Sequence, residues 1–331
     1  MPWPSVRDAV TVRPSPLPVE LGAGPFSTAQ ARLLGVPAAR LRRGGLVHAT
    51  RGGHLAAAPE TLVERAAAYQ VAMPRHRAFS HLTAAVLWGL PLPRALEEAA
   101  ASVDARLHVI APTSDGMVTR AGVVGHRGLE RRTVSTPVGT QLRVVDVADT
   151  WCDLGELRRG TLTLTDLVVA GDAVVALLDA RAGRPVGVAL LRETLRRRTR
   201  PRGAVALRHA LTHVRAGVRS PMESRARLMF VRAGFPEPEV NAPLTDAEGE
   251  WLAEGDLVWR GARLVGEYQG EEHAARRRRS DDSFRRALLE DHDWRVREIW
   301  AEDVWKPARR VATLTSFARV LELDPSTLRI A

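Results

Sequence analysis

Two acidic residues, Asp256 and Glu267, lie in segments that otherwise have the apolar composition of β-strands. The runs at 250–259 and 263–269 are separated by Arg260-Gly261, and a residue pair ending in Gly between two strands predicts a hairpin. Acidic side chains are unfavourable among apolar strand residues unless they have a role. Exposure on an edge strand is the alternative explanation for both of them.

The register of this hairpin decides whether the two carboxylates meet. With a two-residue loop, Trp259 pairs with Ala262 and Asp256 pairs with Val265. Since side chains alternate along a strand, Asp256 and Glu267 then share a face as diagonal neighbours. Two carboxylates that project together form an oxygen-rich site suited to Mg²⁺. A register shift of one residue would place them on opposite faces.

The surrounding residues resemble a nuclease superfamily. Asp256, followed eleven positions later by Glu267-Tyr268-Gln269, is similar to the Asp…Glu-x-Lys core of the PD-(D/E)XK nucleases. The closer resemblance is to the very-short-patch-repair-like nuclease domains of actinobacteria. It covers about a third of the chain and rests on Glu267-Tyr268-Gln269-Gly270, His273, Asp282-Ser283-Phe284-Arg285 and Trp294-Arg295-Val296.

The resemblance implies a Mg²⁺ site, with Mn²⁺ as an alternative ion. Asp256 and Glu267 would bind the ion, and the main-chain carbonyl of Tyr268 would complete the protein's ligands. The ion would polarise a scissile phosphate and lower the pKa of an attacking water. The implied activity is hydrolysis of DNA phosphodiester bonds by an endonuclease or nickase, in defence or repair.

Three further residues take catalytic roles from the same resemblance. Glu223 matches the family's leading Glu, although Ser220 and Glu223 also have the spacing of a helix capping box. Gln269 replaces the usual Lys, and an amide can hold a water but cannot supply a positive charge. His273 is a candidate to contact the scissile phosphate or to assist proton transfer.

A group of arginines follows the nuclease-like strands. Guanidinium groups form bidentate hydrogen bonds with phosphate, so these arginines are candidates to bind the DNA backbone. The candidates are Arg276, Arg277, Arg278, Arg279 and Arg285. In the alternative, Arg285 forms ion pairs with Asp281 and Asp282 on the surface of a helix.

The N-terminal part predicts a winged helix-turn-helix over 25–58. The pattern contains a helix over 28–34 capped by Ser27, a second helix from Pro37 to Arg43, and a hairpin about Arg51-Gly52-Gly53. The segment resembles the winged-helix domain of AbiEi-type antitoxins. The expected DNA contacts are Arg40, Arg42, Arg43 and Arg51. A helical hairpin with a solvated basic face is the alternative.

The remaining regions carry weaker signals. His81, His108 and His126 suggest a metal site, but none has the i, i+4 spacing of a helix-borne ligand pair, so we interpret them as partly buried or surface histidines. The basic run at 196–202 is interpreted equally as a solvated helix end or as a phosphate contact. Cys152, in an apolar helix, is interpreted as structural.

Composition sets the wider limits. The 331 residues carry a formal net charge of +10, which favours a polyanionic partner such as DNA, although every basic residue except Lys306 is an arginine, as GC-rich coding would also produce. A single cysteine excludes a disulfide framework, a zinc finger and an iron–sulfur site. No run is long and apolar enough for a membrane helix and no signal peptide is recognisable, so we expect a cytoplasmic protein.

We therefore predict an α/β multidomain protein: a winged helix-turn-helix, a mixed α/β linker domain and a restriction-endonuclease-like C-terminal domain. The expected function is a Mg²⁺-dependent DNA endonuclease. The alternative is a non-catalytic regulator or antitoxin-like protein that binds DNA and a toxin or other defence partner. The sequence leaves the oligomeric state open. The predicted parts are a Pro-rich tail at 1–24, the winged helix at 25–58, the middle domain at 59–156, a helical connector at 157–218 and the nuclease-like domain at 219–331.

Overall fold

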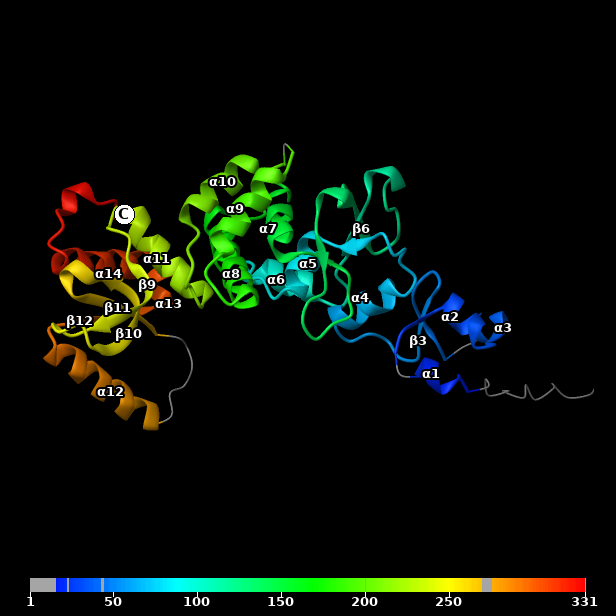
Figure 1. The fold of residues 1–331 in the computed structure, drawn as a ribbon, viewed down its shortest axis with the longest axis horizontal. Helices are drawn as coiled ribbons and strands as arrows, with labels where there is room; N and C mark the ends of the chain where they lie inside the picture. The colour runs from blue at the N-terminus through cyan, green and yellow to red at the C-terminus, as the bar shows by residue number, and fades with distance from the viewer. Residues whose placement is uncertain (1–15, 23, 43–44, 200, 270–275, 331) are drawn as a thin grey trace, which may run out of the picture. The chain divides into compact units, whose positions relative to one another are not determined.

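The fold mixes helices with three separate sheets in the part of the chain that the structure describes. This computed structural model describes residues 16–22, 24–42, 45–199, 201–269 and 276–330. Two compact units are present, the first formed by residues 1–88 and 94–146 and the second by 89–93 and 147–331 (Figure 1). No helix among the described residues is long and apolar enough to cross a membrane.

The first unit begins with a small three-stranded sheet in the order β1-β3-β2, combined with three short helices. Ser27 starts the second helix with a complete capping box, because its hydroxyl accepts from the amide of Gln30 and the Gln30 side chain returns to the Ser27 amide. The elements are α1 (Val19–Gly22), β1 (Phe26–Ser27), α2 (Thr28–Leu33), α3 (Ala38–Arg42), β2 (Val47–Thr50) and β3 (Gly53–Leu55).

The sequence predicts a Pro-rich tail over residues 1–24. Within the described residues, however, Val19–Gly22 forms the single turn α1 directly after Pro18, where the fixed φ of proline suits a helix start. Leu21 of this turn is buried in a cluster with Phe26, Ala31, Val36 and Leu41. Residues 1–15 lie outside the described part.

A five-stranded sheet in the order β6-β5-β4-β8-β7 completes the first unit. Strands β5 and β6 run parallel, and β4 lies antiparallel to β5. The central residues Phe79, Val109 and Val144 are fully buried. The elements are α4 (Leu62–Gln70), β4 (Ala78–Phe79), α5 (His81–Leu87), α6 (Arg94–Ala101), β5 (Leu107–Ala111), β6 (Val123–Arg127), β7 (Val134–Ser135) and β8 (Val144–Val145).

Four helices open the second unit: α7 (Val147–Gly155), α8 (Leu164–Ala182), α9 (Gly187–Arg197) and α10 (Ala204–His213). Within the basic run, Arg198 is buried and binds two buried acids of α7, Asp149 and Asp153. Arg198 is therefore part of the helix packing and not a solvated helix end. Cys152 is also fully buried, as expected for a structural residue, and burial raises the pKa of its thiol to about 12.

The rest of the second unit is a four-stranded sheet in the order β12-β11-β10-β9, with helices on both faces (Figure 1). Strands β9, β10 and β11 are antiparallel, and β12 is parallel to β11. Phe230 of α11 and Phe317 of α14 pack on one face, whereas Leu289 of α12 packs on the other. The elements are α11 (Pro221–Ala233), β9 (Glu239–Thr245), β10 (Trp251–Trp259), β11 (Leu264–Gln269), α12 (Arg276–Asp291), β12 (Arg295–Trp300), α13 (Ala301–Trp305) and α14 (Pro307–Val320).

The register between β10 and β11 differs from the sequence prediction by two residues. Trp259 pairs with Leu264, not Ala262, because residues 260–262 form a 3₁₀ turn and Arg263 follows at φ 43°. A two-residue hairpin turn favours Gly or Asn at positions with positive φ, and Arg260 is poorly suited to that role. The pairing continues to Leu257 with Gly266. A shift of two residues preserves the face of every side chain.

Candidate functional site

The last pair of the β10–β11 ladder is Leu257 with Gly266, so Asp256 and Glu267 are the next residues on the two strands and project from one face of the sheet. Beyond the Leu257–Gly266 pair, the amide of Tyr268 donates to Oδ2 of Asp256 at 2.7 Å. A carboxylate therefore takes a position that a main-chain carbonyl would otherwise occupy. Asp256, Glu267 and Tyr268 are all half-buried.

Arg285 of α12 contacts the second carboxylate. Its Nη2 donates to Oε1 of Glu267 at 2.9 Å, and Nη1 lies 3.5 Å from Oε2. Nη2 also donates to the main-chain carbonyl of Glu254. The arginine expected to bind DNA phosphate is thus placed against a predicted metal ligand.

Glu223 approaches the same region from the first turn of α11. The hydroxyl of Ser220 accepts from the Glu223 amide at 3.1 Å, so half of the predicted capping box is present. The Glu223 carboxylate instead accepts from the amide of Arg219 at 3.0 Å and from Nδ2 of Asn241 at 2.7 Å. Glu223 is buried, and its carboxylate is held toward β9.

A fourth acid, Glu254, joins this group and was not predicted. It lies two residues before Asp256 on β10 and therefore projects from the same face. Its carboxylate pairs with the guanidinium of Arg219. The alternation Glu254-Gly255-Asp256 in a strand was the sequence signal that could have identified it. We call Glu223, Glu254, Asp256 and Glu267 the carboxylate site.

The neighbouring charges of this site shift the pKa of the Asp256 carboxyl. Burial raises the pKa of its carboxyl, and the neighbouring negative charges of Glu223 and Glu254 raise it further. The amide of Tyr268 and the guanidinium of Arg285 oppose this increase in pKa. Burial with like-charged neighbours is the arrangement in which an added cation would be stabilising.

The oxygen donors suit Mg²⁺ by chemical type, since Asp256 and Glu267 project from the same face of the sheet and Mg²⁺ prefers carboxylate ligands. Their oxygens are nevertheless already engaged by the Tyr268 amide and by Arg285. Among the described residues, one group of three potential metal ligands has its ligand atoms within 4.8 Å of one another. This group lies in the first unit and consists of histidines.

Two other residues predicted near the carboxylates have different outcomes. Gln269 ends β11 on the face of Glu267 and is half-buried. His273 lies outside the described residues, so its predicted role as a phosphate contact or proton-transfer group stays a prediction.

The predicted DNA-binding arginines are scattered over both units. In the first unit, Arg42 and Arg51 are exposed and Arg40 is half-buried, while Arg43 is not among the described residues. In the second unit, four of the predicted arginines form the first turn of α12, and the structure describes their helical backbone but not their side chains. These four are Arg276, Arg277, Arg278 and Arg279. The side chains of Asp281 and Asp282, the alternative partners of Arg285, also lie outside the described part, and Arg285 pairs with Glu267.

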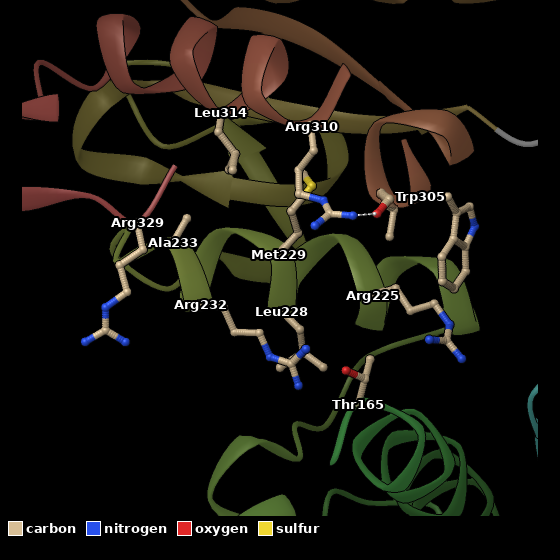
Figure 2. Close-up of a pocket in the computed structure, with 11 residues that line it drawn as sticks. Thr165, Arg225, Leu228, Met229, Arg232, Ala233, Trp305, Arg310, Leu314 and Arg329 are labelled. Atoms are coloured by element: carbon tan, nitrogen blue, oxygen red, sulfur yellow. Dashed lines mark hydrogen bonds between the residues drawn. The ribbon is translucent and has the colours of Figure 1, made fainter. Parts of the chain in front are cut away.

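A separate pocket of about 310 Å³ lies in the second unit between α11, α13 and α14 (Figure 2). Arg225, in its lining, donates to Asp166 at 2.8 Å and stacks on the ring of Trp305, and Arg310 donates to the Val304 carbonyl at 2.9 Å. The pocket residues of α11 project away from the side of the helix that carries Glu223, because successive residues turn by about 100°. The pocket is therefore distinct from the carboxylate site.

Comparison with known proteins identifies relatives but no activity. Two uncharacterized proteins of Mycobacterium tuberculosis, from strains CDC 1551 / Oshkosh and ATCC 25618 / H37Rv, are each 28% identical to this chain over 277 residues. The match covers 82% of this chain and 92% of each relative. No family model matches the chain, and no solved structure matches it significantly.

Proposed function

We propose that this protein is a Mg²⁺-dependent DNA endonuclease or nickase whose carboxylate site hydrolyses a phosphodiester bond. The observation that carries the proposal is the shared face of Asp256 and Glu267, the residues that follow the last pair of the β10–β11 ladder. Three of the motifs on which the resemblance rests lie on successive elements around this hairpin: Glu267 in β11, Asp282-Ser283-Phe284-Arg285 in α12 and Arg295-Val296 in β12.

Each residue of the carboxylate site has a defined task in this proposal. Asp256, Glu267 and the carbonyl of Tyr268 would hold the ion, and the ion would supply Lewis-acid activation of a water and of the phosphate. Glu223, fixed by Asn241, orients the attacking water. Gln269 holds water by hydrogen bonding but adds no positive charge. His273 assists proton transfer or contacts the phosphate.

The N-terminal region delivers the enzyme to DNA in this proposal. The order α1-β1-α2-α3-β2-β3 is typical of a winged helix, in which the last helix and the hairpin contact the duplex. Exposed Arg42 on α3 and Arg51 at the tip of the hairpin supply phosphate contacts. Further phosphate contacts would come from Arg40, Arg43, Arg276, Arg277, Arg278 and Arg279.

A plasmid-nicking assay tests the proposal. Purified protein is incubated with supercoiled plasmid in Mg²⁺, Mn²⁺ or EDTA, beside the variants Asp256→Asn and Glu267→Gln. The control is Glu239→Gln, which removes an exposed strand acid paired with Arg260 outside the carboxylate site. Metal-dependent nicking that both site variants lose and the control retains is expected. Equal nicking by the site variants would assign the activity to another site or to a contaminant.

A second candidate function is a non-catalytic DNA-binding regulator with a toxin or other defence partner. The ion pair between Arg285 and Glu267 favours it, because an occupied ligand and Gln269 in place of Lys suit a degenerate nuclease fold. This candidate predicts no nicking in any metal and unchanged DNA affinity in Glu267→Gln. Arg42→Ala with Arg51→Ala would then weaken binding and flatten its salt dependence.

A further inference from the structure

Three histidines from three elements meet in the first unit. His81 opens α5, and His108 and His126 lie on the parallel strands β5 and β6. Since His108 pairs with Val124, His126 projects from the same face two residues further along the neighbouring strand. The amide of Ser80 donates to the carbonyl of His108 at 3.0 Å, which brings the start of α5 to the same place.

The ligand nitrogens of these residues lie within 4.8 Å of one another. Nδ1 of His108 is 3.0 Å from Nε2 of His126, and the ring of His81 stacks on that of His126 with centroids 3.5 Å apart. In a tetrahedral zinc site, Zn–N bonds of about 2.0–2.1 Å place the nitrogens about 3.4 Å apart. One pair is already close to that spacing, and a rotation of the His81 ring out of the stack would bring the third lone pair to the same point.

We propose that His81, His108 and His126 form a binding site for a divalent transition-metal ion, Zn²⁺ by preference, that is independent of the carboxylate site. Neutral imidazole is a favoured ligand for Zn²⁺ and a poor one for Mg²⁺. Three histidines with the fourth position open to water are an established zinc ligand set. His108 and His126 are only half-buried, so an ion can reach the cluster from solvent.

The supporting contacts fix two of the ligands. Nδ1 of His81 lies 3.0 Å from the buried hydroxyl of Ser80, so Nε2 is the nitrogen that binds the ion. The hydroxyl of Thr83 accepts from the amide of His108 at 2.8 Å and holds the strand at this point. His81 also adopts φ 48°, a backbone conformation rare for a residue with a side chain and concentrated at functional sites.

Zinc titration of the full-length protein tests the site. The chelator-stripped protein competes with a chromophoric chelator for Zn²⁺, and Co²⁺ absorption reports tetrahedral coordination. We expect one tightly bound ion per chain. Removing the hydrogen-bond partner of a metal ligand weakens metal binding about 10- to 100-fold. His108→Asn and His126→Asn each remove a ligand itself, so each should weaken zinc binding by more than this. Ser80→Ala should weaken it within that range.

Two controls separate this site from other donors. His209→Asn removes one histidine of an i, i+4 pair on α10, in which the ring centroids of His209 and His213 are 5.5 Å apart. Glu267→Gln alters the carboxylate site. Both should bind zinc like the wild type. Loss of the tight ion in either control, its retention in His108→Asn and His126→Asn, or no binding by wild type would each overturn the proposal.

A spectroscopic measurement keeps the proposal testable if a variant fails to fold. X-ray absorption at the zinc edge of the loaded wild-type protein should give three imidazole ligands and one oxygen. Two or fewer imidazoles would overturn the three-histidine assignment.

Discussion

Two groups of acidic side chains in the second unit meet arginines in different ways. In the Arg198 network (Asp149, Asp153, Arg197 and Arg198), Nε of Arg198 donates to Asp149 at 3.1 Å and Nη2 donates to Asp153 at 3.0 Å. Both acids are fully buried and lie on α7. In the carboxylate site, by contrast, Asp256 is held by a main-chain amide and has Glu223 and Glu254 as like-charged neighbours.

This difference separates acids whose charge is compensated inside the fold from an acid whose charge is compensated only in part. A buried acid in direct contact with a buried arginine is compensated within the protein, so removing either partner leaves a costly charge. An acid whose pKa is raised by burial and by neighbouring acids has an incompletely compensated environment, which is common at functional sites. Variants in the two groups test this distinction.

Arg198→Ala should give the largest loss of stability. It removes the cation that contacts both Asp149 and Asp153 in the interior, so unfolding should become easier by about 3–5 kcal/mol. Chemical denaturation measures this change. Arg196→Ala is the control. Arg196 is exposed and pairs only with exposed Glu193 in the described contacts, so its removal should leave stability close to that of the wild type. An equal loss of stability in Arg198→Ala and Arg196→Ala would contradict the role of Arg198 in compensating the buried acids.

Mg²⁺ should stabilise the wild-type protein through the carboxylate site. A free concentration tenfold above Kd would add about 1.4 kcal/mol to the free energy of unfolding, because the ion binds the folded state. Thermal unfolding with and without Mg²⁺ measures the effect, and removal of the ion by EDTA should reverse it. Asp256→Asn and Glu267→Gln should lose this response, whereas Glu239→Gln should keep it. A response retained by both site variants would place the ion elsewhere.

Arg285→Gln should have a smaller effect on stability. The pair with Glu267 is partly exposed, so its loss should cost about 0.2–1 kcal/mol. The same change releases a carboxylate that Arg285 occupies, and Mg²⁺ should therefore bind more tightly. Calorimetric titration with Mg²⁺ distinguishes this competition from a purely structural pair, for which ion affinity would not increase.

Asp256 should produce a small pH dependence. Because its pKa is raised in the folded state, the folded protein holds this proton more strongly than the unfolded chain does. Its contribution is therefore favourable at acidic pH and is lost as pH rises from the ordinary aspartate pKa through the raised value. Urea unfolding across this range should show Asp256→Asn gaining stability relative to wild type as pH rises. A constant difference would contradict the raised pKa.

The sequence was most informative where local pattern decides structure. The strands around Asp256 and Glu267 and their common face followed from alternation, and Ser27 capped its helix as its spacing indicated. The register did not follow, because the backbone conformation of Arg260–Arg263 is not encoded by a Gly in the loop alone.

Tertiary contacts account for the residues that sequence analysis missed. A search for i, i+4 pairs misses the histidine cluster, because His81, His108 and His126 come from a helix start and two strands. The i, i+4 rule identifies His209 and His213 instead. The role of Arg198 was equally hidden, since its partners lie 45 and 49 positions earlier in the chain.

The connection between β10 and β11 limits which length changes this protein can accept. Gain or loss of two residues between Trp259 and Leu264 would keep Asp256 and Glu267 on a common face, as the difference between the predicted and observed registers illustrates. A single inserted or deleted residue that shifted the pairing would turn one of them to the opposite face, against the layer that contains Phe230 and Phe317. Natural variation and engineering at this connection should therefore favour even-numbered changes in length.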